Sequence, residues 1–463
     1  MHNLAAVLLD EGNLGEAESL TRQGLELQRK LVGNDHPDVV SSLHQVAIIL
    51  RAQGKLAEAT EVERQVLEMA RRFWGPDHEY IAASLGDLAV MLTEQGEWAE
   101  GEALETEALT MRRKLWGNEH PDIAFSLDNL GMERRNLGKL AEAETFLREA
   151  VAMRKKLLGS EHPSVARSLL HLASVLEKEG RLEEAESLCR EALAINRSVF
   201  AGQPANWEAD IDCLAGICLA RHEEGEIEKL FNELLTPALQ SQPEAASLFR
   251  NRARFLARRS RWKEAAEDAR KALAFKPNDV NAGHLLILLR AAEGDAEGCR
   301  EASQQALARF TATNEPVAAA QMALDCLLFP PGGAHLAMAA ELAGRALTLG
   351  TNNHFLPQFE FCKALAEYRE GHFASAADWS ARLLATKVPP ANERLRPQAG
   401  LVLAMARRQL QQSNEARAAL TRGIRLAQTN SPRSDANDLG NEWPDWIVAQ
   451  VLSREANQLI GGE

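Results

Sequence analysis

The chain has 463 residues, of which 25% are charged and only 5% are aromatic, and its formal net charge is −14. So acidic a chain is poorly suited to non-specific contact with nucleic acid or with an anionic membrane surface, and we expect neither partner. No apolar run reaches the roughly 20 residues that span a bilayer, and no signal-peptide pattern opens the chain. These features together predict a cytoplasmic protein.

Five stretches of the first two hundred residues carry the same pattern at a fixed interval of 42 residues. The turn glycines of the five copies are Gly12, Gly54, Gly96, Gly138 and Gly180. A second marker recurs in step with them at Gly33, Gly75, Gly117 and Gly159. Self-similarity at such a period predicts a stacked solenoid, whose units bury their apolar faces against their neighbours.

Each copy predicts two helices. Within residues 37–75, two apolar stripes of helical spacing lie on either side of Gly54. The first stripe comprises Leu43, Val46, Ala47 and Leu50, and the second comprises Leu56, Ala59, Val62, Val66 and Met69. Pro37 suits the first turn of a helix, and Gly75 suits a helix end. The repeat is therefore a helical hairpin.

The G-x-L-x-E-A turn, the alternating small and large positions and the L-x-G-x-x-H-P connector resemble the tetratricopeptide repeat. They are most similar to its 42-residue variant found in kinesin light chain, and the resemblance covers roughly residues 1–200. It implies an all-α, right-handed superhelix with a concave groove that is lined by the first helix of each pair.

From about residue 205 the pattern continues in a looser form. We expect further turns at Gly225, Ser260, Gly294, Gly333, Gly371 and Ser413. Ser260 and Gly294 are 34 residues apart, which is the ordinary tetratricopeptide period. The whole chain is thus predicted to be a tetratricopeptide-repeat superhelical solenoid of about eleven helical hairpins plus a C-terminal capping helix. The predicted parts are a kinesin light chain-type array (1–204), a degenerate array (205–427), a polar linker (428–442) and the capping helix (443–463).

The two ends of the chain suggest an alternative context. Met1 aligns with Leu43 of the next copy, so the first helix lacks six residues of the repeat. Either this start is tolerated or, as we favour, the chain is the C-terminal piece of a longer protein. The closing W-x-D-W…R-E-A-x-x-L segment also resembles the end of bacterial serine/threonine kinases that carry repeat arrays.

Chemistry is not predicted. The most conspicuous polar pattern is a repeated acid–histidine pair, at Asp35-His36, Asp77-His78, Glu119-His120 and Glu161-His162. Successive repeats are displaced by about 10 Å, the width of a helix pair, so these histidines form a row that cannot converge on one ion. We expect them to be structural connectors, and we expect no catalytic residue, cofactor or metal.

Polar residues recur where the resemblance places the groove. Nine residues before each turn glycine stand Asn3, Gln45, Asp87, Asn129 and His171, and three before it stand Arg51 and Arg135, among others. In the family an asparagine at the first of these positions typically bonds the backbone of a ligand, so Asn3 and Asn129 inherit that role most directly. The alternative is a solvated helix face, and both interpretations stay open.

One cationic face contrasts with the acidic background. Arg250, Arg254 and Arg258 are spaced i, i+4, i+8 and share one helix face with Asn251 beside them. The set resembles part of the clamp with which some tetratricopeptide domains hold the C-terminal carboxylate of a peptide, but the next helix offers only Asn281 and His284. Arginine binds carboxylates and phosphates bidentately. The alternative is a solubilising stripe neutralised by Glu264 and Glu267.

We therefore predict a non-enzymatic scaffold for protein–protein interaction, which binds a peptide or a protein surface in its concave groove. The expected partner is an acidic or phosphorylated peptide at a site centred on Arg254. One alternative is the C-terminal regulatory or substrate-recruiting region of a larger bacterial signalling protein, such as a serine/threonine kinase. Another is homotypic assembly through the exposed first helix.

Overall fold

The computed structural model of the chain describes residues 2–10, 13–310, 315–329, 333–350, 355–386, 393–429 and 438–461. These residues form 23 α-helices and three short 3-10 helices, with no strand among them. The helices belong to two compact units, which we call the N-terminal unit (residues 1–201) and the C-terminal unit (residues 202–351 and 355–463). The predicted all-α repeat architecture is confirmed.

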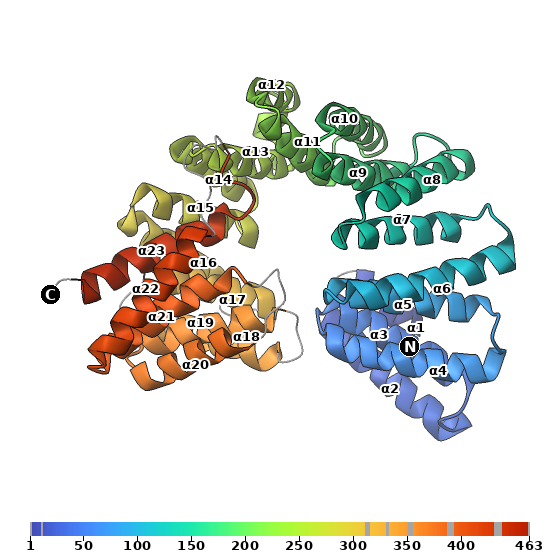
Figure 1. Cartoon of the computed structure of the whole chain (residues 1–463), viewed down its shortest axis with the longest axis horizontal. Coiled ribbons are helices and arrows are strands. Elements are labelled where there is room, and N and C mark those ends of the chain that lie inside the picture. Colours follow the sequence, from blue (N-terminus) through green and yellow to red (C-terminus); the bar gives the residue numbers. More distant parts are fainter. Residues whose placement is uncertain are drawn as a thin grey trace. The chain divides into compact units, whose positions relative to one another are not determined.

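The N-terminal unit consists of five helical hairpins, each packed on the next (Figure 1). Its helices are α1 (His2–Asp10), α2 (Leu14–Val32), α3 (Pro37–Ala52), α4 (Leu56–Trp74), α5 (Glu79–Glu94), α6 (Trp98–Trp116), α7 (Pro121–Asn136), α8 (Leu140–Leu158), α9 (Pro163–Lys178) and α10 (Leu182–Val199). From α3 to α9 every first helix has 16 residues, and from α2 to α8 every second helix has 19.

The turn inside each hairpin follows from its glycine. Gly54, Gly96, Gly138 and Gly180 all adopt positive φ, between 75° and 84°, which side chains resist. The next amide then bonds back across the helix end, as Lys55 N–H does to the Leu50 carbonyl at 2.9 Å. This bond is part of the usual glycine stop of a helix. Gly12, the first predicted turn glycine, lies outside the described residues.

The connector histidines are helix caps. His36, His78, His120 and His162 each precede a first helix, and their Nδ1 atoms accept the backbone N–H two residues later at 3.1–3.3 Å. This bond satisfies one of the free N–H groups at the start of the helix. Trp116 stacks on His120 with ring centroids 4.3 Å apart. The predicted structural role of the histidines is confirmed.

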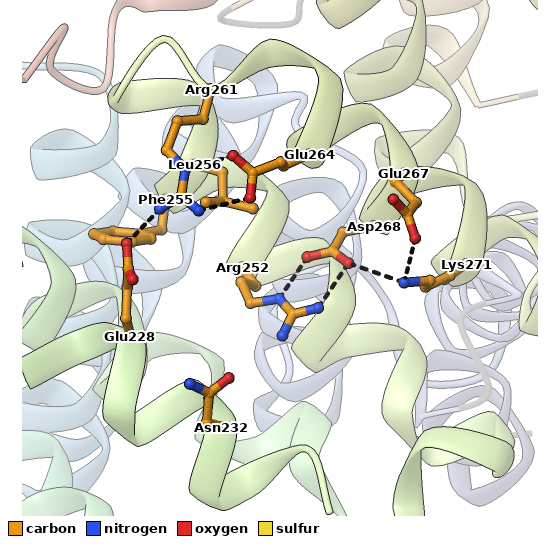
Figure 2. Close-up of a pocket in the computed structure, with 10 residues that line it drawn as sticks. All are labelled: Glu228, Asn232, Arg252, Phe255, Leu256, Arg261, Glu264, Glu267, Asp268 and Lys271. Atoms are coloured by element: carbon orange, nitrogen blue, oxygen red, sulfur yellow. Dashed lines mark hydrogen bonds and ion pairs between the residues drawn. The ribbon is translucent and has the colours of Figure 1, made fainter. Parts of the chain in front are cut away.

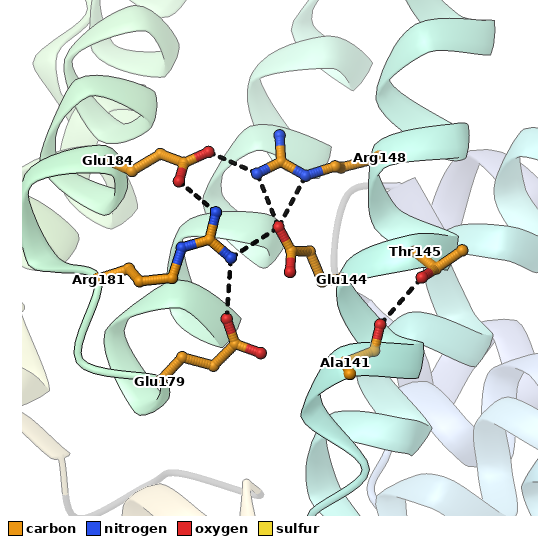
Figure 3. A network of polar contacts seen from close by, with 7 residues as sticks. All are labelled: Ala141, Glu144, Thr145, Arg148, Glu179, Arg181 and Glu184. Atoms are coloured by element: carbon orange, nitrogen blue, oxygen red, sulfur yellow. Dashed lines mark hydrogen bonds and ion pairs between the residues drawn. The ribbon is translucent and has the colours of Figure 1, made fainter.

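Ion pairs connect neighbouring repeats along their second helices. Pairs with a spacing of 36 residues join Arg22 to Glu58, Arg64 to Glu100, Arg71 to Glu107, Arg113 to Glu149, Arg148 to Glu184 and Lys155 to Glu191. Figure 3 shows one such junction, where Glu144 receives both Arg148, at 2.7 Å, and Arg181, at 2.8 Å. Most of these side chains are exposed, so each pair contributes little to stability by itself.

The C-terminal unit contains six further hairpins and a last helix (Figure 1). Its helices are α11 (Glu208–Ala220), α12 (Glu224–Leu234), α13 (Ala246–Arg258), α14 (Trp262–Phe275), α15 (Val280–Glu293), α16 (Ala296–Phe310), α17 (Pro316–Leu328), α18 (Ala334–Leu349), α19 (Leu356–Arg369), α20 (Phe373–Ala385), α21 (Leu395–Gln409), α22 (Ser413–Thr429) and α23 (Trp443–Ile460). The 3-10 helices are Pro204–Trp207, Leu239–Ser241 and Pro243–Ala245.

Most of the expected turns of this unit are in place. Ser260, Gly294, Gly333 and Gly371 all have positive φ between the helices of their pairs. The prediction for Gly225 is wrong, because His222 takes the positive φ and Gly225 lies within the first turn of α12. With eleven hairpins among the described residues, the predicted repeat number is confirmed.

The last helix, α23, packs against α15, α17, α21 and α22. Val448, Leu452 and Ala456 of its predicted apolar stripe are buried, whereas Leu459 is half-buried. Most of the predicted linker, residues 430–437, lies outside the described residues. The part that is described, residues 438–441, contacts α13, since Leu439 N–H donates to the Arg258 carbonyl at 2.9 Å. In the described part of the chain, every helix is too short or too polar to cross a bilayer.

Candidate functional site

A cavity of about 340 Å³ opens on the first-helix side of the C-terminal unit. It lies beside the N-terminal ends of α11 and α23 and between α13 and α15. Its lining residues are Glu208, Arg250, Arg254, Arg258, Asn281, His284, Leu285, Leu288, Asn441, Trp443 and Pro444. We call it the arginine cavity. It gathers all three arginines of the predicted cationic face.

Helix α13 presents these arginines to the cavity because its opposite face is buried in the core. Leu248, Ala253 and Leu256 are buried, and an i, i+4, i+8 spacing keeps the arginines on one face. The three side chains differ in their access to solvent. Arg250 and Arg258 are 16% and 13% exposed, whereas Arg254 is 44% exposed. Arg254 is therefore the arginine most open to a ligand.

Carboxylates of the chain already contact each arginine. Arg250 pairs with Glu208 at 2.7 Å and with Asp279. Arg254 binds Asp212 at 2.7 Å and lies 3.5 Å from Glu208.

The counter-ions predicted from the sequence were wrong. Glu264 binds Arg261 and Glu267 binds Lys271, both away from this cavity. The carboxylates that do neutralise the arginines come from neighbouring first helices and from residue 438.

Asn251 does not take the place that the repeat register predicts. Its side chain is buried, and it does not line the arginine cavity. In the orientation that satisfies its partners, its amide nitrogen donates to Glu208 Oε1 at 3.1 Å and to the Ser247 carbonyl at 3.2 Å. Asn251 therefore positions Glu208, and the prediction that it faces the groove was wrong.

The opposite wall, on α15, carries a histidine beside a buried carboxylate. His284 Nδ1 lies 2.6 Å from Asp325 Oδ1, and Asp325 is fully buried. Burial alone would lower the pKa of His284, but the Asp325 carboxylate outweighs it and raises that pKa. Across the cavity, burial raises the pKa of Asp212 even though Arg254 opposes this. Each shift favours the protonated form of its group.

A second cavity, of about 380 Å³, lies between α12, α13 and α14 (Figure 2). Its cations face its own carboxylates. Arg252 binds Asp268 at 2.5 and 2.8 Å, Arg261 binds Glu228 and Glu264, and Lys271 binds Glu267 at 2.8 Å. These pairs connect the residues of α12, α13 and α14 that line the cavity.

The predicted polar row of the N-terminal unit lies on α3, α5, α7 and α9, and its members are half-buried. Asn129 donates to Glu105 at 3.1 Å, His171 contacts Asp128 at 3.0 Å, and Asp87 lies 3.7 Å from His44. Gln45 holds the same position on α3, and the Asn3 side chain lies outside the described residues. Three members of the row therefore already contact polar side chains of the same unit.

The two arginines of that unit are also engaged. Arg51 makes a bidentate contact with Glu94, at 2.6–3.1 Å, and Arg135 Nε donates to the Ser174 carbonyl at 3.4 Å. Burial lowers the pKa of Arg135, so its charge is less well solvated than that of a surface arginine. Contact of these residues with a ligand stays a prediction.

Sequence reasoning missed the buried carboxylates that hold the row. Glu63 and Glu105 are fully buried on the second helices, and Asp128 is nearly so on α7. Glu63 accepts from Ser84 at 2.5 Å and contacts His44, while Glu105 contacts both Arg112 and Asn129. Their signal was present, because Glu63 and Glu105 are one period apart at a position that is leucine and cysteine in later copies.

Among the described residues, Glu367, Glu370 and His372 form the only cluster close enough to share one metal ion. Glu367 already pairs with Lys363 and lies 3.2 Å from His372. Lys363 and His372 contact different oxygens of the Glu367 carboxylate, and we propose no metal role for this cluster.

Comparison with known proteins agrees with the repeats. Models described as tetratricopeptide repeat match residues 1–72, 80–156 and 122–198, and a further one matches residues 232–280. Together they cover more than half of the chain. The chain belongs to the tetratricopeptide-repeat family, whose repeats serve as scaffolds for protein–protein interaction.

Several solved structures are similar. Kinesin-light-chain-like repeats from Podosopora anserina are 29% identical over 43% of this chain and 94% of that one, with a TM-score of 0.38. BtubC (BKLC) from P. vanneervenii is 21% identical over 47% of this chain and 87% of that one, at 0.42. Yeast Tom70 is 14% identical over 99% and 95%, also at 0.38. A search of curated proteins finds no match.

Proposed function

We propose that this tetratricopeptide-repeat protein is a cytoplasmic, non-enzymatic scaffold that binds an acidic or phosphorylated peptide in the arginine cavity, with Arg254 at the centre of the site. The observation that carries the proposal is the exposure of Arg254 inside a cavity of about 340 Å³. Arg254 comes from a first helix, the helix that lines the ligand groove in this family.

The wall opposite the arginines suits the rest of a peptide. Leu285, Leu288, Trp443 and Pro444 offer apolar contact next to the guanidinium groups. Asn281 adds an amide that can bond a peptide backbone. Such a mixture of apolar walls with a few polar groups is typical of ligand sites.

A ligand has to compete with Asp212 for Arg254, because the two already form an ion pair at 2.7 Å. Burial raises the pKa of Asp212, so its charged form is less stable than a solvated carboxylate. A phosphate brings up to two charges and three acceptor oxygens, and thus competes better than a single carboxylate. We therefore expect phosphorylated peptides to bind more tightly than acidic ones.

The proposal is tested with fluorescein-labelled peptides that differ at one residue: phosphoserine, aspartate or alanine. Their anisotropy is measured against the whole chain and against Arg254→Gln. Loss of a charged hydrogen bond should weaken binding of the phosphoserine peptide about tenfold. The matched control is Arg64→Gln, since Arg64 is 45% exposed and pairs with the carboxylate of Glu100. Equal binding by the native chain and Arg254→Gln contradicts the proposal, as does an equal loss in Arg64→Gln.

A second contact surface is proposed on the first helices of the N-terminal unit. It comprises Gln45, Asp87, Asn129, His171, Arg51 and Arg135. The half-buried row and its carboxylate supports give these side chains fixed positions, which favours recognition of an extended backbone. The alternative role, as a regulatory region of a larger signalling protein, is suggested by the closing W-x-D-W segment.

A further inference from the structure

We propose that residues 438–441 form an arm that binds Arg258 at the edge of the arginine cavity as an intramolecular ligand, and that the partner peptide carries two acidic side chains, one of which replaces Asp438 at Arg258. This inference deepens the proposed function and rests on it, because it specifies the ligand of the same cavity. The arm is the stretch of chain just before α23.

The arm contacts α13 as an acidic peptide would. The Asp438 carboxylate accepts two hydrogen bonds from the Arg258 guanidinium. Nε donates to Oδ1 at 2.8 Å, and Nη2 donates to Oδ2. Arg258 Nη1 also donates to Asn441 Oδ1 at 3.2 Å. The Leu439 N–H donates to the Arg258 carbonyl at 2.9 Å, and so satisfies a free carbonyl at the end of α13. These are side-chain and backbone contacts that a separate peptide can reproduce.

The arm can exchange without unfolding the helix that follows it. Ile447, Val448 and Leu452 anchor α23 in the core, and each is at most 2% exposed. Trp443 is also buried, with its ring centroid 5.7 Å from that of Trp262. By contrast, residues 438–440 are half-buried and Asn441 is exposed. Release of the arm therefore costs polar contacts, which a ligand replaces with equivalent ones.

The spacing of the arginines defines the spacing of the ligand acids. Arg254 and Arg258 are one turn apart on α13, so their Cβ atoms are about 5–6 Å apart. In an extended peptide, side chains at i and i+2 point to one side and are separated by about 6.6 Å. A peptide with the pattern Asp-x-Asp thus places one carboxylate at the half-open Arg254 and the other at Arg258, in the position of Asp438. A phosphoserine can replace either aspartate.

The experiment compares two fluorescein-labelled peptides of nine residues, made of Ala, Ser and Gly around a central Asp-Ala-Asp or Asp-Ala-Asn. Each is titrated with the whole chain and with Asp438→Asn. Weakening the bidentate contact between Asp438 and Arg258 should raise the affinity for the two-acid peptide about tenfold, which is the size of one charged hydrogen bond. The affinity for the one-acid peptide should stay unchanged. Arg258→Gln should reduce the affinity for the two-acid peptide to that for the one-acid peptide.

The matched control is Glu442→Gln. Glu442 directly follows the arm, and its substitution removes the same charge as Asp438→Asn. Its side chain is 68% exposed and pairs with Arg394 rather than with Arg258. An equal gain in Asp438→Asn and Glu442→Gln overturns the inference, because the effect is then general electrostatics. An equal gain for both peptides overturns it too. If Asp438→Asn lowers the melting temperature, Asn441→Ala should give a smaller gain in the same direction. Failure of both peptides to bind any variant, at any salt, contradicts the proposed function itself.

Discussion

The two units use charge in different ways. In the N-terminal unit, exposed ion pairs connect second helices at a constant spacing of 36 residues, and buried acids such as Glu105 hold polar side chains of the first helices. In the C-terminal unit, arginines of the first helices bind carboxylates that come from far along the sequence. Arg258 and Asp438 are 180 residues apart, and Arg369 and Glu455 are 86 apart. The C-terminal unit thus adds long-range ion pairs to pairs between neighbouring hairpins, such as Arg254 with Asp212, which are 42 residues apart.

This difference indicates where each unit can accept a partner. In a contact that recurs with the period, the neighbouring repeat supplies the second side chain, which is therefore always present. A contact that breaks the period depends on one segment, such as residues 438–441, and can be replaced. We therefore place the principal ligand site in the irregular unit, although the regular unit carries the clearer sequence pattern. The predictions that follow test whether the polar groups of the regular unit are structural.

The largest effect is expected from Arg112→Met in α6. Arg112 and Glu105 are buried together at 3.0 Å, and Gly86 leaves the room that the guanidinium fills. The substitution leaves the Glu105 charge without its cation, which should cost about 3–5 kcal/mol of unfolding free energy. Urea denaturation, with hydrogen exchange in α6 and α7 to localise the loss, measures it.

The next residue on the same helix is the control for Arg112. Arg113 is 40% exposed and pairs with an exposed Glu149, so Arg113→Met should cost less than about 1 kcal/mol. Similar losses for both variants contradict a structural role that is specific to the buried pair.

A second test uses pH. Burial and the neighbouring Glu105 raise the pKa of Glu133 to about 8, and Thr93 donates to it at 3.0 Å. A carboxyl with a raised folded pKa keeps its full stability below the unfolded value, near 4.5, and loses it as the pH rises through about 8. Glu133→Gln removes this loss. The variant should match the native chain at pH 5 and melt about 3 °C higher at pH 8.5.

The readout for Glu133 is the difference between the two melting curves, since other groups titrate equally in both chains. A difference that stays constant from pH 5 to pH 8.5 contradicts the raised pKa. A variant that is less stable at every pH shows instead that Glu133 is needed as an anion.

How much could be predicted from the sequence depends on the range of each interaction. The turn at Gly54 and the caps at His36 and His120 involve residues at most five positions apart, so the pattern alone defines them. The turn near Gly225 was misplaced because the prediction relied on a glycine rather than on the period. Forty-two residues after Gly180 stands His222, which takes the positive φ without being a glycine.

The candidate site was predicted in part for the same reason. The arginine face of α13 follows from helical spacing alone, and in the structure Arg254 is 44% exposed. Its neighbours depend on tertiary packing. Asp438 reaches Arg258 from 180 residues away, and Asn251 is buried against Glu208, which no local pattern indicates. Glu105 was overlooked because a single acid on an amphipathic helix ordinarily faces solvent.

The smallest effect is expected from the exposed pairs of the regular unit. Arg148 contacts Glu144 and Glu184 and so connects two repeats, yet it is 46% exposed (Figure 3). Solvent and salt screen such a pair, so Arg148→Gln should cost under about 1 kcal/mol and lose that effect in 1 M NaCl. Urea denaturation at low and high salt measures both. A loss near that of Arg112→Met, or one that persists in salt, means that these ion pairs, rather than the buried groups, hold the repeats together, and the contrast between the units then disappears.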